Sequence, residues 1–194
     1  MKGIRVILAS ASPRRAQLLK LIGLDFEIIP SEIQENHELF AIPEVHVLEW
    51  SQKKAMNVAE KVDEGLIIGA DTIVVLNNKI LGKPGNENEA KQMLRELSGQ
   101  THIVYTGFAL IHKPSGEIIN DYDKTFVTFR TLQDSEIEAY VKTGHPMDKA
   151  GAYGIQDESA VFAEKIEGCF YNVVGFPLTK FYLSLKKFLQ ALNV

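Results

Sequence analysis

Two serines and two arginines stand close together near the start of the chain, in the segment Ala9-Ser10-Ala11-Ser12-Pro13-Arg14-Arg15. The apolar run Ile4 to Leu8 precedes this segment, and a helix-like pattern follows it. Ser12 is a good N-cap and Pro13 suits the first helical position, so a helix is predicted to begin at Pro13. Free backbone N–H groups, serine hydroxyls and two arginines on one turn are suited to bind a phosphate. A capped helix with solvated arginines is the alternative interpretation.

Asp71 is a second candidate for chemistry, because it lies inside the apolar run Leu66 to Leu76. An ionised carboxylate is expensive to bury without a partner cation or metal. One interpretation is structural, with the side chain capping backbone at the end of a strand. The other is a general base or metal ligand held on a rigid element. Gly69 and Ala70, with little or no side chain, leave room for a ligand beside it.

Three lysines have weaker local signals. Lys83 stands between a glycine and a proline, a context that leaves little bulk around its ammonium group and lets it reach a phosphate. Taken singly, a solvated lysine is the commoner outcome. Lys53 and Lys54 fall in the middle of a helical pattern, where exposure to solvent is usual. Local sequence does not separate these two neighbours.

The remaining polar candidates differ in what they offer. Gln156 lies in a glycine-rich stretch and carries both a donor and an acceptor, as reading a base edge requires. Glu35 lies in a polar loop and has no local signal of its own. The five histidines, at positions 37, 46, 102, 112 and 145, have no metal-ligand spacing. The sequence also lacks the Walker loop, the dinucleotide-binding glycine motif and the serine-hydrolase elbow.

The elements that must position these residues alternate along the chain. Apolar periodicity and turn residues predict helices over 13–22, 43–61, 90–97, 135–142 and 177–192. They predict strands over 4–8, 25–30, 66–76, 79–82, 160–166 and 169–174, with a long hairpin over 102–130. A capping box is predicted for Ser135 and Glu138. Interleaved strands and helices indicate the α/β class, and the hairpins favour a mixed sheet.

Composition limits the functions that need to be considered. The chain has 194 residues, is 45% hydrophobic and carries a net charge of −4. This charge argues against a sequence-independent nucleic-acid binder, which needs a broad basic face. No apolar run approaches the ~20 residues that span a bilayer, and the N-terminus lacks a signal-peptide pattern, so a cytoplasmic protein is expected. The lone Cys169 excludes an internal disulfide and a cysteine-based zinc cluster.

Six segments, in order along the chain, resemble the Maf family of nucleoside triphosphate pyrophosphatases. They are Ser10–Arg15, Gly69–Thr72, Gly82–Pro84, Leu97–Gly99, Asp148–Gln156 and Asn172–Gly175. The stretch Asp148–Gln156 is similar to the subgroup that hydrolyses dTTP and UTP, as distinct from the subgroup that acts on methylated GTP. The resemblance implies one Maf-type domain over residues 1–194. It also implies a twisted mixed sheet flanked by helices, in two lobes with a nucleotide cleft between them, as in inosine triphosphatases.

The resemblance also implies roles for individual residues. Asp71 would accept the proton of an attacking water, and phosphate contacts would come from Ser10, Arg14, Arg15, Lys54 and Lys83. Glu35 and Asp71 would hold Mg²⁺ or Mn²⁺, both of which prefer oxygen ligands. Substrate specificity would rest on Arg14, Thr72 and Gln156. Lys53 stays a solvated residue, and a homodimer that contacts neither membrane nor nucleic acid polymer is expected.

The implied reaction is hydrolysis between the α- and β-phosphates, giving a nucleoside monophosphate and pyrophosphate. Two alternatives share the same phosphate site. A nucleotide sensor would bind a triphosphate without turnover, although binding an anion gains nothing from a nearby carboxylate such as Asp71 unless a metal intervenes. A nucleotidyl transferase would pass the α-phosphate to an acceptor. Product analysis separates the three.

Overall fold

The computed structural model describes residues 4–34 and 42–192 of the chain. Its helices are α1 (Pro13–Leu21), α2 (Pro43–Ala59), α3 (Glu87–Leu97), α4 (Asp134–Val141), α5 (Phe170–Val174) and α6 (Leu178–Ala191). Its strands are β1 (Val6–Leu8), β2 (Glu27–Ile28), β3 (Gly65–Leu76), β4 (Lys79–Leu81), β5 (Thr101–Lys113), β6 (Ile118–Phe129) and β7 (Ala163–Glu167). Short 3₁₀ helices lie at His145–Asp148, Ala150–Ala152 and Glu158–Phe162.

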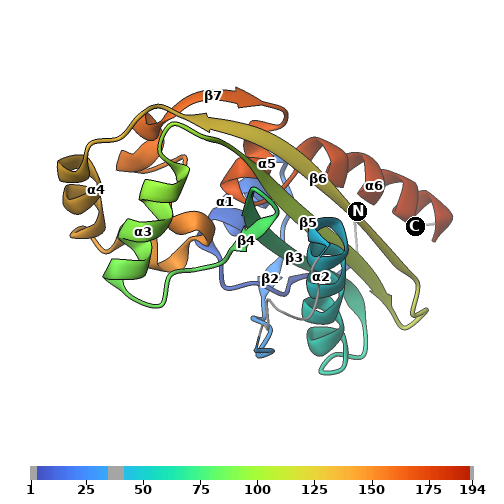
Figure 1. The fold of residues 1–194 in the computed structure, drawn as a ribbon. Coiled ribbons are helices and arrows are strands. Elements are labelled where there is room, and N and C mark those ends of the chain that lie inside the picture. The colour runs from blue at the N-terminus through green and yellow to red at the C-terminus, as the bar shows by residue number, and fades with distance from the viewer. Residues whose placement is uncertain (1–3, 35–41, 193–194) are drawn as a thin grey trace. The chain divides into compact units, whose positions relative to one another are not determined.

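The seven strands form one mixed sheet in the order β2-β1-β3-β5-β6-β7, with β4 paired to β3. The strand β1 runs parallel to both β2 and β3, whereas β3 with β4 and β6 with β7 are antiparallel. The predicted α/β class with a mixed sheet is therefore confirmed. In the β1–β3 register Leu8 pairs with Ile68, so the residues that follow β1 lie beside the middle of β3. Figure 1 shows the two long strands β5 and β6 side by side.

The chain divides into two compact units. Unit 1 comprises residues 1–71, 106–123 and 175–194, and unit 2 comprises residues 72–105 and 124–174. The boundaries fall within β3, β5 and β6 and directly after α5, so each of these three strands contributes residues to both units. The two compact units agree with the two lobes that the resemblance implies.

In unit 1, helices cover both faces of β5. On one face, α2 packs through Ala55, Val58 and Ala59 against apolar residues of β1, β3 and β5. Gly107 lies on this face, where a Cβ would stand 2.3 Å from the carbonyl oxygen of Val47. The next residue, Phe108, points to the other face, as alternation along a strand requires. There its ring contacts Phe181 of α6 with centroids 5.5 Å apart.

In unit 2, α3 and α4 pack against each other and against the 3₁₀ segments that follow α4. The core contains the apolar stripe of α3, together with Val127 and Phe129 of β6. The ring of Phe129 makes edge contacts with Tyr153 and Phe162, at centroid distances of 4.8 and 6.0 Å. Aromatic packing thus holds the segment 150–162, which contains only short 3₁₀ helices, against the sheet.

Most predicted elements are found within a few residues of their expected bounds, including the hairpin turn at Asn77 and Asn78, where both residues have positive φ. Three details are wrong. The segment Cys169–Val174 is not a strand, because Phe170–Val174 forms α5. The strand predicted over 160–166 begins only at Ala163, after a 3₁₀ helix.

The third wrong detail is the capping box predicted for Ser135 and Glu138. The helix α4 begins at Asp134 with Gln133 as its N-cap residue, two residues earlier than this pair requires. The carboxylate of Glu136 accepts a hydrogen bond of 3.0 Å from the backbone N–H of Gln133 instead. Arg130 holds the same carboxylate by two further hydrogen bonds of 2.6 and 2.9 Å. The carboxylate that caps the start of α4 is therefore also held by a tertiary contact with Arg130.

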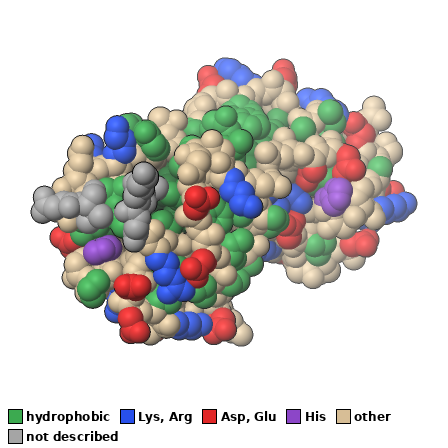
Figure 2. All heavy atoms as spheres, turned by 180° about the vertical axis from the view of Figure 1, so that it is seen from behind, with side chains coloured by type: hydrophobic (Ala, Val, Ile, Leu, Met, Phe, Trp, Pro, Cys, Tyr) green, Lys and Arg blue, Asp and Glu red, His purple; other side chains and the backbone are tan. Residues whose placement is uncertain are grey.

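The surface carries both signs of charge. On the face drawn in Figure 2, lysine and arginine side chains are interspersed with aspartate and glutamate, and apolar side chains lie among them. The full sequence has a net charge of −4. Over residues 4–34 and 42–192, none of the helices combines the length and apolar character needed to cross a membrane.

Candidate active site

Asp71 forms the centre of a buried cluster in unit 1. Its side chain is 3% exposed, and its Oδ1 accepts a hydrogen bond of 2.6 Å from Nζ of Lys54. Lys54 is itself buried, although it lies in the middle of α2. Two opposite charges that are both removed from water hold each other in place, because neither has solvent to replace its partner. Of the two adjacent lysines, Lys54 therefore faces the sheet.

The close approach of α2 to β3 explains this pairing. Gly69 precedes Asp71 by two residues on β3, and a Cβ at Gly69 would lie 2.1 Å from the carbonyl oxygen of Ser51 and 2.8 Å from the amide nitrogen of Ala55. Only a residue without a side chain allows the helix backbone to come so near. Ser51 and Ala55 flank Lys54 on α2, so the same contact brings the ammonium group to Asp71.

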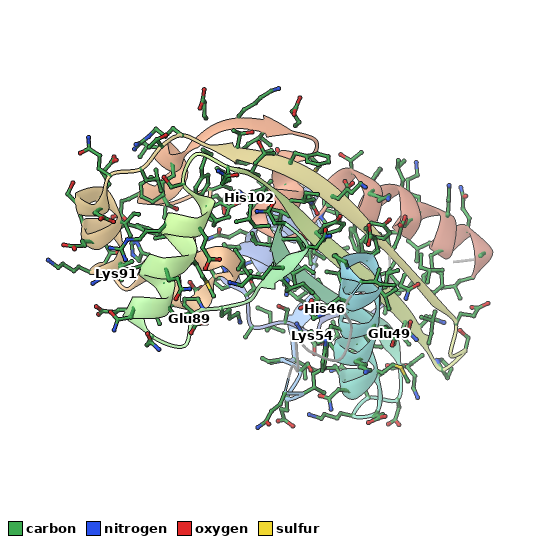
Figure 3. The ribbon with its side chains drawn as sticks, viewed as in Figure 1. His46, Glu49, Lys54, Glu89, Lys91 and His102 are labelled. Carbon is green, nitrogen blue, oxygen red and sulfur yellow. The ribbon has the colours of Figure 1, made fainter. Side chains whose placement is uncertain are left out.

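His46 is a third member of the cluster that local spacing did not predict. It lies on α2 eight residues before Lys54, and Figure 3 labels both side chains on this helix. The ring is fully buried, and its Nε2 is 3.8 Å from Oδ2 of Asp71. The sequence signal that would have found it is the spacing 46, 50 and 54, which places His46 and Lys54 on one face of the helix.

The ionisation of Asp71 reflects opposing effects. Burial, the largest effect, raises the pKa of the carboxyl group, whereas the charge and hydrogen bond of Lys54, with smaller contributions from Arg15 and His46, lower it. The cations prevail, and the pKa lies below its ordinary value. Asp71 is therefore ionised near neutral pH and able to accept a proton.

Arg15 and Ser10 are held together at the end of β1. One guanidinium nitrogen of Arg15 donates to Ser10 Oγ at 3.1 Å and to the carbonyl oxygen of Ala70 at 3.0 Å. Its Nε donates to the carbonyl oxygen of Gly175 at 3.0 Å. The parallel register of β1 and β3 agrees with this arrangement, since Leu8 pairs with Ile68 and both Ser10 and Ala70 follow this pair by two residues. Arg15 thus joins three distant segments next to Asp71 and adds positive charge there.

The start of α1 is as predicted in position but different in detail. The helix begins at Pro13 with Ser12 as its N-cap residue, yet the Ser12 side chain makes no capping hydrogen bond within the described residues. The backbone N–H of Ser12 instead donates to Ser10 Oγ at 3.2 Å. Arg14 follows in the first turn, which contains no acidic residue. An N-terminus with this charge pattern is suited to an anion.

The remaining predicted residues belong to unit 2 or lie outside the described residues. Thr72 follows Asp71 on β3 and is half-buried, whereas Lys83 and Gln156 are exposed. The carbonyl oxygen of Gly82, next to Lys83, accepts a hydrogen bond of 3.0 Å from Gly151 in the stretch that leads to Gln156. Glu35 falls in the range 35–41, outside the part of the chain that the structure describes.

Comparison with known proteins identifies the family. A family model described as Maf-like protein matches residues 5–188. The chain belongs to the Maf family. Two relatives, from Bacillus cereus (strain AH820) and Bacillus anthracis (strain CDC 684 / NRRL 3495), are each 47% identical over 184 residues, which is 95% of this chain and 95% of theirs. Both are named dTTP/UTP pyrophosphatase.

A solved structure is more distantly similar to this Maf-family chain. It is the crystal structure of a nucleoside-triphosphatase, or dITP/XTP pyrophosphatase, from Mycobacterium abscessus. The sequence identity is 14% and the TM-score 0.44, and the similarity covers 66% of this chain and 76% of that one.

The donor set around Asp71 bears on whether this Maf protein holds a metal. No group of three or more histidine, cysteine, aspartate or glutamate side chains with metal-binding geometry occurs among residues 4–34 and 42–192. Oδ2 of Asp71 is nevertheless buried, and within those residues it accepts no hydrogen bond. A carboxylate oxygen with spare acceptor capacity fits a hard divalent cation. Asp71 alone is one ligand, so a metal would need further oxygens from outside this cluster.

Proposed function

We propose that this chain hydrolyses dTTP and UTP to the nucleoside monophosphate and pyrophosphate. The observation that carries the proposal is the buried Lys54–Asp71 pair, with the two atoms 2.6 Å apart and Arg15 nearby, on a chain of the Maf family. The proposed substrates, dTTP and UTP, are those in the name of the two relatives. The match over residues 5–188 supports a single catalytic domain.

In this proposal Asp71 takes a proton from the attacking water. The water oxygen forms a bond to the α-phosphorus, the bond from that phosphorus to the bridging oxygen breaks, and pyrophosphate leaves with the bond electrons. Ser10, Arg14, Arg15, Lys54 and Lys83 contact the phosphates. Fixed positive charge stabilises the phosphoryl oxygens as charge develops on them, without rearrangement during the reaction.

Lys54 has a second consequence for the proposed base. While it pairs with Asp71, it keeps the carboxylate ionised but also lowers its affinity for a proton. A bound triphosphate carries about four negative charges near neutral pH and would share the ammonium group of Lys54. This sharing weakens the effect by which Lys54 lowers the pKa of Asp71. The carboxylate thus becomes a stronger base when substrate is present.

Mg²⁺ or Mn²⁺ belongs to the same proposal. Asp71 would be one ligand through its Oδ2, and Glu35 is the second residue that the family resemblance implies. A bound divalent ion supplies charge neutralisation at the phosphates. Removal of the ion with a chelator is expected to abolish turnover, and Mg²⁺ or Mn²⁺ is expected to restore it.

Base selection is proposed to rest on Arg14, Thr72 and Gln156. Thymine and uracil present an imide N–H between two carbonyl oxygens. An amide side chain can accept a hydrogen bond from this N–H and donate one to a neighbouring carbonyl oxygen. A site built around such hydrogen bonds rejects a base that leaves them unpaired. We also expect a cytoplasmic homodimer that acts on free nucleotides, since these are the proposed substrates.

The test is product analysis of the purified protein with Mg²⁺ and a panel of dTTP, UTP, CTP, GTP, ATP and 7-methyl-GTP. Pyrophosphate from dTTP and UTP, with little from the others, is the expected result. Asp71→Asn is expected to lose most turnover while retaining triphosphate binding, because the amide keeps the shape but cannot take the proton. Binding without turnover in the unaltered protein would indicate a sensor, and free phosphate would place the attack elsewhere.

A further inference from the structure

The exposed side chain of Gln156 stands on a tightly tied turn in unit 2. The backbone N–H of Asp157 donates to the carbonyl oxygen of Gly154 at 3.2 Å, which makes Ile155 and Gln156 the two central residues of the turn. Ile155 is buried and Gln156 is exposed. The turn therefore has one apolar side chain inside and one amide side chain outside.

Asp157, at the end of this turn, accepts hydrogen bonds from two other residues. The backbone N–H of Ser159 lies 3.0 Å from Oδ1, and the Ser159 hydroxyl lies 2.7 Å from the same oxygen. The hydroxyl of Tyr140, from α4, is 3.1 Å from Oδ2 and 3.2 Å from Oδ1. Burial is the main cause that raises the pKa of Tyr140, so this hydroxyl keeps its proton and donates.

The ion pair and the packing of Gly154 complete the arrangement. Nζ of Lys149 is 3.3 Å from Oδ2 of Asp157, and these side chains are only 12% and 17% exposed. A Cβ at Gly154 would lie 2.6 Å from Lys149 and 2.7 Å from Asp157. The backbone of Gly154, at the start of the turn, is thus packed directly against the Lys149–Asp157 ion pair.

Ser159 ties the two sides of the turn to each other. Its buried hydroxyl accepts from the N–H of Gly154 at 3.0 Å and lies 2.9 Å from the carbonyl oxygen of the same residue. On the chain before the turn, the hydroxyl of Tyr153 is hydrogen-bonded to Nε2 of His102 at 2.8 Å. Both flanks of Gln156 are therefore fixed by buried polar contacts.

We propose that Asp157 is a positioning residue that orients Gln156 and so sets the selectivity for the base. The proposal rests on the proposed function, in which Gln156 contacts thymine or uracil. A side chain that reads a base by two hydrogen bonds must be held within roughly 0.5 Å of its working position, and an exposed side chain such as Gln156 is not held so closely by the turn alone. Asp157 supplies it through Tyr140, Lys149 and Ser159.

The first test is Asp157→Asn, which keeps the shape of the side chain but removes its charge and one acceptor oxygen. The ratio of kcat/KM for dTTP over dCTP is expected to fall roughly tenfold, the effect of losing about one well-oriented hydrogen bond. The loss should lie in KM for dTTP, with kcat nearly unchanged. A fall in kcat with an unchanged ratio would overturn the proposal.

Glu158→Gln is the matched control. It makes the same change of charge one residue away, at a side chain that is 63% exposed and pairs with His145 at 2.8 Å on the surface. The dTTP/dCTP ratio is expected to stay at the unaltered value. An equal fall in both variants would attribute the effect to loop charge and overturn the positioning role.

A double variant separates this inference from the proposed function. If Asp157 acts through Gln156, adding Asp157→Asn to Gln156→Ala leaves the ratio at the Gln156→Ala value, whereas independent losses overturn the inference. A normal ratio in Gln156→Ala itself would remove the base contact from the proposed function and the inference with it. Loss in Gln156→Ala but not in Asp157→Asn would overturn the inference alone.

Tyr140→Phe is a second variant that tests the same proposal if Asp157→Asn does not fold. It removes one donor to Asp157 and preserves the edge contact of the ring with Phe162, whose centroid is 5.5 Å away. The ratio is expected to fall roughly threefold, since a single neutral hydrogen bond is lost. A normal ratio in this variant would also count against the proposal.

Discussion

Asp71 is 3% exposed, so its charge is balanced by protein groups rather than by water. Lys54 occupies Oδ1, while Oδ2 faces the ring of His46 at 3.8 Å. A carboxylate placed in this way remains ionised only while its cations remain. The Lys54–Asp71 pair therefore contributes both to the stability of unit 1 and to the chemistry proposed for Asp71.

Replacing Lys54 by Met is expected to destabilise the protein by about 3–5 kcal/mol near pH 7, because one charge of a buried pair is left without its partner. The loss should shrink as the pH falls. In the unaltered protein the pKa of Asp71 is lowered, so its contribution persists above the ordinary value and is lost only as the pH falls through the lowered value. Without Lys54, burial is the largest remaining effect on the pKa of Asp71 and raises it, so protonation is expected to relieve the variant.

Urea unfolding of both proteins near pH 7 and at about pH 4.5 measures this difference. Lys79→Met serves as the control, because Lys79 is 60% exposed and pairs with Glu96 at the surface. It should change the free energy of unfolding by less than about 1 kcal/mol at either pH. A Lys54→Met penalty that does not depend on pH would mean that the lost contact is packing rather than charge.

Single residues were predictable from sequence where the surrounding pattern made them unusual. Asp71 is a carboxylate in an apolar strand, and the structure places it buried within β3. Lys53 and Lys54 are adjacent, so only the rotation of α2 decides which one is buried, and local sequence does not fix that rotation. His46 was missed because its spacing to Lys54 on α2 becomes informative only once Lys54 is known to face Asp71 on β3.

At the scale of elements, the contact of α2 with β3 sets the geometry of the cluster. Gly69 and Gly107 both face the backbone of α2, at Ser51 and Val47 respectively. These two glycines let one helix approach two strands, and the approach fixes the distance from Lys54 to Asp71. A change at either glycine acts on the site through the position of the helix.

Gly69→Ala is therefore expected to lower stability by about 3 kcal/mol or more, or roughly 6–12 °C in Tm for a chain of this size. A Cβ there meets backbone atoms of α2 at 2.1 and 2.8 Å, and backbone cannot rotate away as a side chain can. Turnover should fall as well, since Lys54 moves with the helix. Thermal unfolding and dTTP hydrolysis on the same samples measure both effects.

Gly85→Ala is the control for this substitution. A Cβ at Gly85 would meet only the end of the Glu89 side chain, at 3.2 Å, and that flexible chain can yield. The change in stability should stay within about 0.5 kcal/mol. Equal losses at Gly69 and Gly85 would show that the approach of α2 is not the cause.

The element that sequence mispredicted most clearly is α5. Four of its five residues, all but Asn172, are aromatic or β-branched types that favour strands. Tertiary contacts override this preference, since the buried Asn172 side chain donates to the carbonyl oxygen of Val104 and to Thr125 Oγ1 at 3.0 and 3.1 Å. Long elements such as β3 and α2 were predictable because their periodicity extends over many residues, which a five-residue helix cannot offer.

At the scale of the whole molecule, each unit buries a titratable group of its own. Unit 1 contains Asp71, and unit 2 contains His102 on β5. His102 contacts the rings of Phe129 and Tyr153. Burial lowers the pKa of His102 to about 4, so the ring is neutral in the folded protein. The two groups make the protein sensitive to acid in different ranges of pH.

The pKa shift of His102 has the opposite sign to that of a histidine paired with a carboxylate. The unfolded chain binds a proton at an ordinary pKa of 6.5, whereas the folded protein resists it down to about 4. The contribution of His102 is therefore complete above pH 6.5 and is lost as the pH falls toward 4. Over that range the loss amounts to about 3 kcal/mol.

His102→Gln tests this directly, because glutamine can still bond the Tyr153 hydroxyl but does not titrate in this range. Its free energy of unfolding should be lower than that of the unaltered protein near pH 7 and should fall less steeply between pH 7 and 4. Hydrogen exchange at both pH values assigns the effect, since lost protection should concentrate in residues 72–105 and 124–174. Parallel pH profiles for the two proteins would mean that His102 is already accessible to protons in the folded state. A steeper loss of stability in acid for the unaltered protein alone would show that protonation of His102 is linked to unfolding.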